Sequence, residues 1–148
     1  MKTYKTNLNE LILKRKSTDF KRVKIKSSKD SAEYVRNFYS DDLTIFESFF
    51  LLLLNNQNNT IGYAKISQGG VCGTVVDVKI VCKYAIESLS TRVILCHNHP
   101  SGALSPSRAD KVITRKLKEG LKLFDIEILD HIILTENSYF SFADEGIL

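Results

Sequence analysis

The chain has 148 residues, of which 43% are hydrophobic and 26% are charged. These proportions are typical of a soluble globular domain and exclude a disordered or low-complexity chain. The longest apolar run, Phe49 to Leu54, is far shorter than the roughly 20 residues that a membrane-spanning helix needs. No apolar segment with a cleavage site follows Met1, so we expect a cytoplasmic protein that makes no membrane contact.

Positive charge is concentrated near the N-terminus. Residues 1–40 hold 11 of the 21 lysines and arginines but 4 of the 17 acidic residues, a net charge of +7 against −3 for the remainder. Such a segment can make a weak contact with a polyanion such as nucleic acid. It lacks the regularly interleaved aromatic residues that stack on bases, which favours a solvated arm. We therefore predict a basic arm over residues 1–21 and a single domain over residues 22–148.

The first half of the chain shows alternating helix and strand patterns. We expect a short amphipathic helix over Leu8–Leu13, a first strand over Val23–Lys26 and a helix over residues 29–39. Residues 45–54 are rich in Phe, Leu and Ile and predict a buried strand. An Asn-rich turn separates them from residues 60–67, so the two segments predict a β-hairpin.

The second half continues the alternation. Asp77 is a suitable N-cap for a helix that follows it, and residues 93–96 predict a short strand. The next helix is expected over Ser107–Gly120, because serine favours helix starts and glycine favours helix ends. Residues 123–134 predict one or two strands, and residues 139–142 a last short strand. The order predicts an α/β or α+β domain with a mixed central β-sheet flanked by helices.

The three cysteines do not suggest a disulfide framework. Cys72, Cys82 and Cys96 are odd in number and widely spaced, with no Cys-x-x-Cys pair, so we expect reduced thiols. Cys96 directly precedes His97, and alternation along a strand turns its side chain away from that histidine.

One segment carries residues suited to a metal site. His97 and His99 are two residues apart at the end of a predicted strand, so both imidazoles point to one side. Asp110 lies in the first turn of the following helix, which the loop can fold back over the strand end. Two nitrogens and one carboxylate oxygen suit zinc and leave a fourth position for water, as in catalytic sites. A His-x-His pair alone is often surface material, and Ser107-x-x-Asp110 is also a capping pattern, but their combination is far more specific.

The combined pattern resembles a known family. His97-x-His99-x(7)-Ser107-x-x-Asp110 is similar to the JAMM motif of the JAB/MPN metallohydrolases, and the string His-Asn-His-Pro-Ser-Gly resembles their bacterial RadC branch. The resemblance covers roughly residues 22–148. It implies the cytidine-deaminase-like JAB/MPN architecture, in which a mixed sheet is flanked by helices. Two further segments add to it: Gly73–Asp77 and Leu129–Ile133.

The resemblance also implies roles for individual residues. In such sites the residues that match His97, His99 and Asp110 bind zinc, and the residue that matches Ser107 assists the oxyanion. A glutamate from an upstream strand acts on the zinc-bound water. The family does not use the position of His131 as a ligand, so we expect His131 to be structural or to lie beside a ligand.

Physical reasoning selects Glu47 as that glutamate. It lies at the start of the most apolar predicted strand, where a carboxylate is costly unless it has a polar partner. A zinc-bound water supplies such a partner, whereas Glu33 and Glu87 lie in polar surroundings where solvent suffices. The alternative is that Glu47 is a partly exposed acid at a strand edge.

These observations predict a zinc-dependent metallohydrolase that cleaves an amide bond in a peptide or protein conjugate. Glu47 is expected to act as general base and acid, and Ser107 to stabilise the oxyanion. No glycine-rich phosphate loop is present, so we expect no nucleotide cofactor. The alternative is a non-catalytic module that binds nucleic acid or is associated with DNA repair, but such a module would not need the full set of residues.

Overall fold

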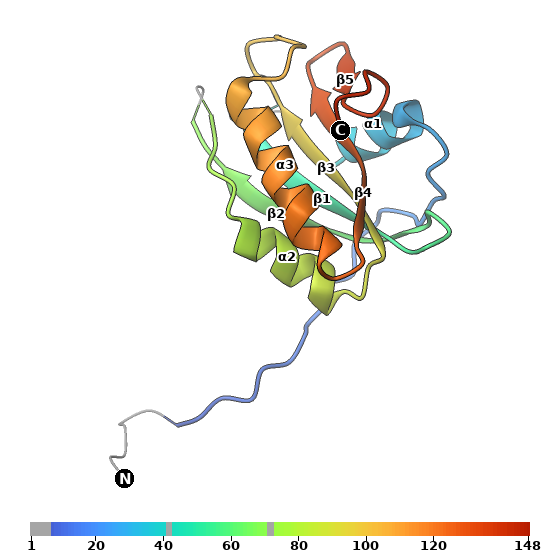
Figure 1. Ribbon diagram of the computed structural model, residues 1–148, viewed down its shortest axis with the longest axis vertical. Helices are drawn as coiled ribbons and strands as arrows, with labels where there is room; N and C mark the ends of the chain where they lie inside the picture. The colour runs from blue at the N-terminus through green and yellow to red at the C-terminus, as the bar shows by residue number, and fades with distance from the viewer. Residues whose placement is uncertain (1–6, 41–42, 71–72) are drawn as a thin grey trace.

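The computed structural model describes residues 7–40, 43–70 and 73–148. Within them, five strands form one mixed sheet in the order β2-β1-β3-β4-β5 (Figure 1). Strands β3 and β4 are parallel, and the other neighbouring pairs are antiparallel. The predicted mixed sheet flanked by helices is therefore confirmed. The strands are β1 (Ser48–Leu54), β2 (Thr60–Gln68), β3 (Arg92–Asn98), β4 (Glu127–Leu134) and β5 (Tyr139–Ser141).

Helices cover both faces of this sheet (Figure 1). Because side chains alternate along a strand, Leu95 of β3 packs toward α2 and α3, whereas Ile94 and Cys96 pack toward α1. Cys96 is fully buried, and burial raises the pKa of its thiol to about 12. Its predicted orientation away from His97 is confirmed. The helices are α1 (Ser28–Arg36), α2 (Val78–Glu87) and α3 (Arg108–Lys122).

Side-chain caps start all three of these helices. The Ser27 hydroxyl accepts a hydrogen bond from the Asp30 amide at 3.1 Å, and the Asp77 carboxylate accepts one from the Lys79 amide at 2.8 Å. Ser107 caps α3 in the same way. Each cap satisfies an amide that has no partner within its helix. Cys82 is a free thiol like Cys96, and the prediction for Cys72 lies outside the described residues.

Several predicted boundaries were wrong. Residues 8–13 form no helix and are exposed, because a segment this short needs packing to be helical. Residues 23–26 form only an isolated bridge between Lys24 and Asn59. The buried strand begins at Ser48 rather than residue 45, and the next-to-last strand begins at Glu127 rather than residue 123.

Gly120 lies inside α3 and does not end it. A Cβ atom at this position would lie 3.6 Å from a methyl carbon of Val78 and 3.7 Å from the sulfur of Cys82. The small residue therefore lets α3 pass close to α2, so its role is in packing rather than in capping.

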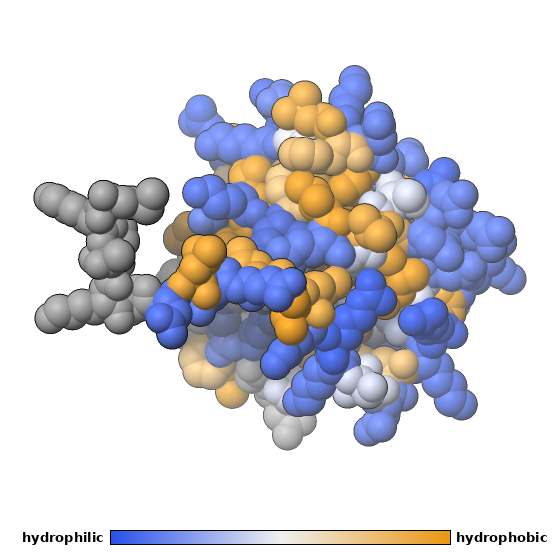
Figure 2. Space-filling model, turned by 90° about the horizontal axis from the view of Figure 1, so that it is seen from below, coloured by the Kyte–Doolittle hydropathy of each residue, from blue (hydrophilic) through white to orange (hydrophobic). Residues whose placement is uncertain are grey.

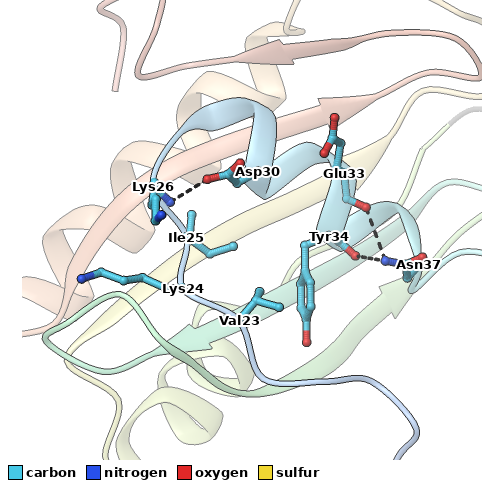
Figure 3. Close-up of a pocket in the computed structure, with 8 residues that line it drawn as sticks. All are labelled: Val23, Lys24, Ile25, Lys26, Asp30, Glu33, Tyr34 and Asn37. Carbon is cyan, nitrogen blue, oxygen red and sulfur yellow. Dashed lines mark hydrogen bonds between the residues drawn. The ribbon is translucent and has the colours of Figure 1, made fainter.

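Residues 23–26 attach to the hairpin turn and to α1. The Thr60 amide donates to the carbonyl of Val23 at 2.8 Å. The Lys26 amide donates to the Asp30 carboxylate at 2.9 Å (Figure 3). Ile25 is buried among the side chains under α1. Residues 7–22 are exposed. Phe20 still packs against Phe38 and Tyr63, and the start of the described chain extends away from the domain (Figure 1). No helix in the described part of the chain has the length and apolar composition to cross a membrane.

Candidate metal centre

Four residues expected to act together meet at the end of β3. His97 lies in β3, His99 directly follows it, Asp110 lies in the first turn of α3, and Glu47 directly precedes β1. Because β1 and β3 are antiparallel, the start of β1 lies beside the end of β3. One ligand atom from each of the four residues lies within 4.8 Å of the others.

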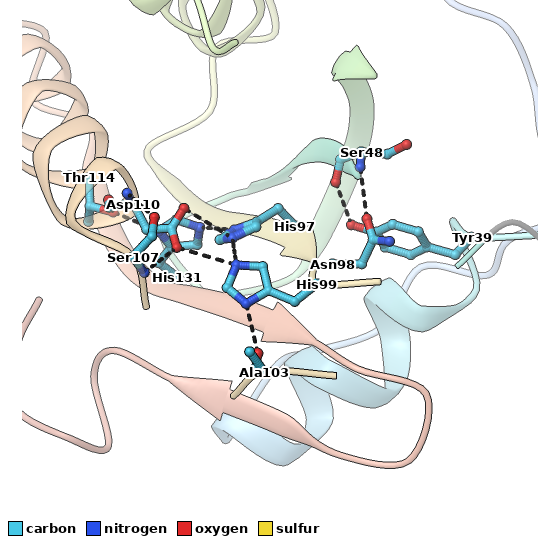
Figure 4. A network of polar contacts seen from close by, with 10 residues as sticks. All are labelled: Tyr39, Ser48, His97, Asn98, His99, Ala103, Ser107, Asp110, Thr114 and His131. Atoms are coloured by element: carbon cyan, nitrogen blue, oxygen red, sulfur yellow. Dashed lines mark hydrogen bonds and ion pairs between the residues drawn. The ribbon is translucent and has the colours of Figure 1, made fainter. Parts of the chain in front are cut away.

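The spacing of three of these residues fits a metal ion. The Nε2 atom of His97 lies 3.2 Å from one Asp110 carboxylate oxygen, and Nε2 of His99 lies 3.3 Å from the other (Figure 4). The two Nε2 atoms are 2.9 Å apart. Ligand atoms about 2.0–2.1 Å from a tetrahedral zinc ion stand roughly 3.3–3.4 Å apart. The structure thus brings His97, His99 and Asp110 into an arrangement that could hold such an ion.

Asp110 is positioned by the capping box of α3. Its carboxylate accepts a hydrogen bond from the Ser107 amide at 2.7 Å, and its own amide donates to the Ser107 hydroxyl at 3.0 Å. Burial opposes ionisation of Asp110, but its contacts with the imidazoles of His97 and His99 outweigh burial and hold its pKa well below the usual range. Capping and metal binding are therefore compatible roles for one carboxylate, as the sequence indicated.

Glu47 lies just before the strand in which it was expected. Its amide donates to the carbonyl of Gly70 at 3.2 Å, and its carbonyl accepts from the amide of Gly69 at 2.8 Å. The carboxylate is half-buried and makes no hydrogen bond or ion pair with another described residue. Burial raises the pKa of Glu47, and electrostatic interactions with the nearby imidazoles of His97 and His99 partly offset this effect. A half-buried carboxylate with a raised pKa is suited to accept a proton and to release it again.

Asn98 holds the segment that carries Glu47, and the sequence analysis missed it. This buried side chain accepts a hydrogen bond from the Ser48 amide at 2.8 Å. Its amide group donates to the carbonyls of Leu43 at 2.6 Å and Phe46 at 2.7 Å. The available signal was chemical: an asparagine between two converging histidines is buried and must find partners.

The second nitrogen of each histidine also has a partner. Nδ1 of His99 lies 2.7 Å from the carbonyl oxygen of Ala103. The hydrogen bond to Asp110 raises the pKa of His99, against the effect of burial. Nδ1 of His97 lies 2.7 Å from Nε2 of His131, whose pKa is lowered by its complete burial. His131 lies behind His97 and outside the four-residue group.

Sequence comparison gives the family. The RadC-like JAB domain family matches residues 25–147. The chain belongs to this family. The family match and the group of His, Asp and Glu residues together fit a metallohydrolase.

Relatives support the same assignment. A UPF0758 protein of Flavobacterium johnsoniae is 49% identical over 124 residues, which cover 84% of this chain and 53% of that relative. The UPF0758 proteins YfjY and YeeS of Escherichia coli are 42% and 43% identical over 102 residues, which cover 69% of this chain and 64% and 69% of those relatives. The chain spans about half the length of the first of these relatives.

Proposed function

We propose that this RadC-like JAB domain is a zinc-dependent metallohydrolase that cleaves an amide bond in a peptide or an isopeptide-linked protein conjugate. The observation that carries the proposal is the four-residue group. The Nε2 atoms of His97 and His99 lie 2.9 Å apart, and each lies 3.2–3.3 Å from a different oxygen of the Asp110 carboxylate. The Glu47 carboxylate beside them has no other partner among the described residues.

The donor set favours zinc. His97 and His99 supply imidazole nitrogens and Asp110 supplies a carboxylate oxygen, which leaves one of four tetrahedral positions open, as in catalytic zinc sites. When bound, zinc lowers the pKa of water to about 7 and polarises the carbonyl of the amide.

Two residues supply the remaining chemistry. Glu47 takes a proton from the attacking water and delivers it to the leaving amine, first as general base and then as general acid. The Ser107 oxygen accepts from the Asp110 amide, and no described residue accepts the hydroxyl proton. That proton is therefore free to stabilise the oxyanion that forms at the attacked carbonyl.

A screen of peptides and isopeptide-linked conjugates tests this function. We expect cleavage that is abolished by a chelator, restored by zinc and absent in His97→Ala. The control is Lys116→Ala, an exposed position on α3. Cleavage that survives chelation, or that persists in His97→Ala, would contradict a metal-dependent reaction at this site.

One surface feature favours a second candidate function, a weak contact with nucleic acid. A groove lies between the basic arm and β2 and is lined by Lys14, Arg15, Lys16, Arg22 and Lys65, with no acidic residue among its lining side chains. Phe20, Tyr63 and Tyr84 also line it, and aromatic rings can stack on bases. From below, the surface shows hydrophilic side chains between separate hydrophobic patches (Figure 2).

Titration of a fluorescent single-stranded oligonucleotide tests this contact. We expect binding that weakens steeply as salt rises, because neutralising phosphates releases counterions. Replacing Lys14, Arg15 and Lys16 by glutamine should weaken it further, whereas the same change at Lys111, Lys116 and Lys118 of α3 should not. Binding that changes neither with salt nor with the substitutions in the arm would exclude a contact with nucleic acid through this groove.

A further inference from the structure

Two buried polar residues next to the candidate metal centre have no part in the proposed chemistry. His131 of β4 is fully buried, and Thr114 of α3 is 3% exposed. They link two of the expected ligands (Figure 4). Nε2 of His131 lies 2.7 Å from Nδ1 of His97, and Nδ1 of His131 lies 2.7 Å from the Thr114 hydroxyl oxygen. That hydroxyl lies 2.6 Å from the backbone carbonyl of Asp110.

The position of each proton in this chain follows from what each group can donate. A carbonyl oxygen only accepts, so Thr114 gives its single hydroxyl proton to Asp110. The contact between Thr114 and His131 then requires that Nδ1 of His131 donates. No carboxylate of a described residue contacts the ring of His131, which lies between the rings of Phe142 and Phe49, so its neutral form is the one that fits. A neutral ring with its proton on Nδ1 accepts at Nε2.

The same reasoning extends to His97. Because Nε2 of His131 accepts, Nδ1 of His97 carries a proton and donates it. The lone pair of a neutral His97 then lies on Nε2, the atom that faces His99 and Asp110. This is the form in which imidazole binds a metal.

We propose that Thr114 and His131 form a relay of positioning residues that holds His97 in the tautomer able to bind the metal. The relay rests on the proposed metal site and adds residues outside its ligand set. His99 needs no relay, because its Nδ1 faces the carbonyl of Ala103, which can only accept.

The relay is needed because Nε2 of His131 can either accept a hydrogen bond from His97 or donate one to it. Without the Thr114 hydroxyl, His131 can place its proton on Nε2 and donate to His97. His97 would then carry its own proton on Nε2, where the metal must bind. The hydroxyl of Thr114 therefore decides which nitrogen of His97 is available.

Thr114→Val tests the relay, because valine keeps the shape of threonine and removes the hydroxyl. Thr114→Ser, which keeps the hydroxyl, is the matched control. Zinc affinity of the full chain is measured by competition with a chromophoric chelator. We expect Thr114→Val to bind zinc roughly 10–100-fold more weakly, and Thr114→Ser to bind close to the wild-type level. Equal zinc affinity in Thr114→Val and the wild type would overturn the relay and leave the metal site in place.

Nitrogen NMR of the histidine rings gives a second readout that no purely structural role would change. In the metal-free wild type we expect the His131 proton on Nδ1, and in metal-free Thr114→Val a shift toward Nε2. The wild-type spectrum decides the matter even if the valine variant folds poorly, since a proton on Nε2 of His131 would contradict the relay. Failure of the wild type to bind zinc would instead contradict the proposed function.

Discussion

The candidate metal centre has a buried half and an open half. His97 and Asp110 are 1% and 8% exposed, and His97 is supported from behind by the side chain of His131. In the open half, Glu47 and His99 are only half-buried, and His99 is supported by a backbone carbonyl. The difference teaches that side-chain substitutions behind the site can change metal binding through His97, whereas His99 depends on the path of its loop. Variants of Glu47, which is not assigned as a ligand, should affect turnover before they affect metal content.

Glu47→Gln is expected to give the largest difference between the effect on turnover and the effect on zinc content. Glutamine keeps the volume of the side chain and removes the base, so turnover should fall by roughly 10²–10⁴-fold. Zinc content, measured in parallel, should remain at the wild-type level. Glu33→Gln, at an exposed position of α1, is the control and should change neither quantity. Full activity with zinc bound would rule out the role of Glu47 as base, and loss of zinc would make Glu47 a ligand.

Ser107→Ala should have a smaller effect on turnover. Loss of one oxyanion donor costs about 10²–10³-fold in rate, and loss of the α3 cap costs about 1 kcal/mol of unfolding free energy. Ser27→Ala removes the cap of α1 and should lower stability similarly without changing turnover. Steady-state kinetics and denaturant unfolding measure the two effects. Equal turnover in Ser107→Ala and Ser27→Ala would show that Ser107 takes no part in the reaction.

Asn98→Ala should affect the open half through the backbone. The substitution leaves an amide and two carbonyls without their partner, which should cost about 1–3 kcal/mol for each group that stays buried and unsatisfied. Turnover should fall because the segment that carries Glu47 is released, while zinc content should be retained. Asn56→Ala, in the exposed hairpin turn, is the control. A zinc-free Asn98→Ala protein would show that Asn98 supports the buried half instead.

Removal of the arm should have the smallest effect on the metal centre. Phe20 packs against Phe38 and Tyr63, so a deletion of residues 1–19 keeps this contact. We expect the melting temperature and zinc content of the shortened protein to match those of the full chain. A lower zinc content would mean that the arm contributes to the site.

Much of the expected ligand set could be predicted because its signals are local. The His-x-His spacing at a strand end and the Ser-x-x-Asp pattern at a helix start determine where His97, His99 and Asp110 point. The Asp77 cap of α2 and the alternation along β3 are local in the same sense, and the structure confirms them.

The parts that escaped prediction depend on distant contacts. Thr114 meets His131 only because α3 packs against β4, and Asn98 meets Leu43 only through the turn before β1. The contact between the Ala103 carbonyl and His99 could not be predicted either, because any residue carries a backbone carbonyl. Gly120 was expected to end a helix, because glycine is common at helix ends. Its close approach to α2, which explains the glycine, is visible only in three dimensions.

Metal analysis of protein purified without added metal tests the central claim most directly. The account predicts about one zinc ion per chain in the wild type, because two histidines and one aspartate make a three-ligand open site. His97→Ala and Asp110→Ala should each lose most of that zinc. Zinc at the wild-type level in both variants would contradict the assignment of these residues as ligands, and with it the proposed chemistry.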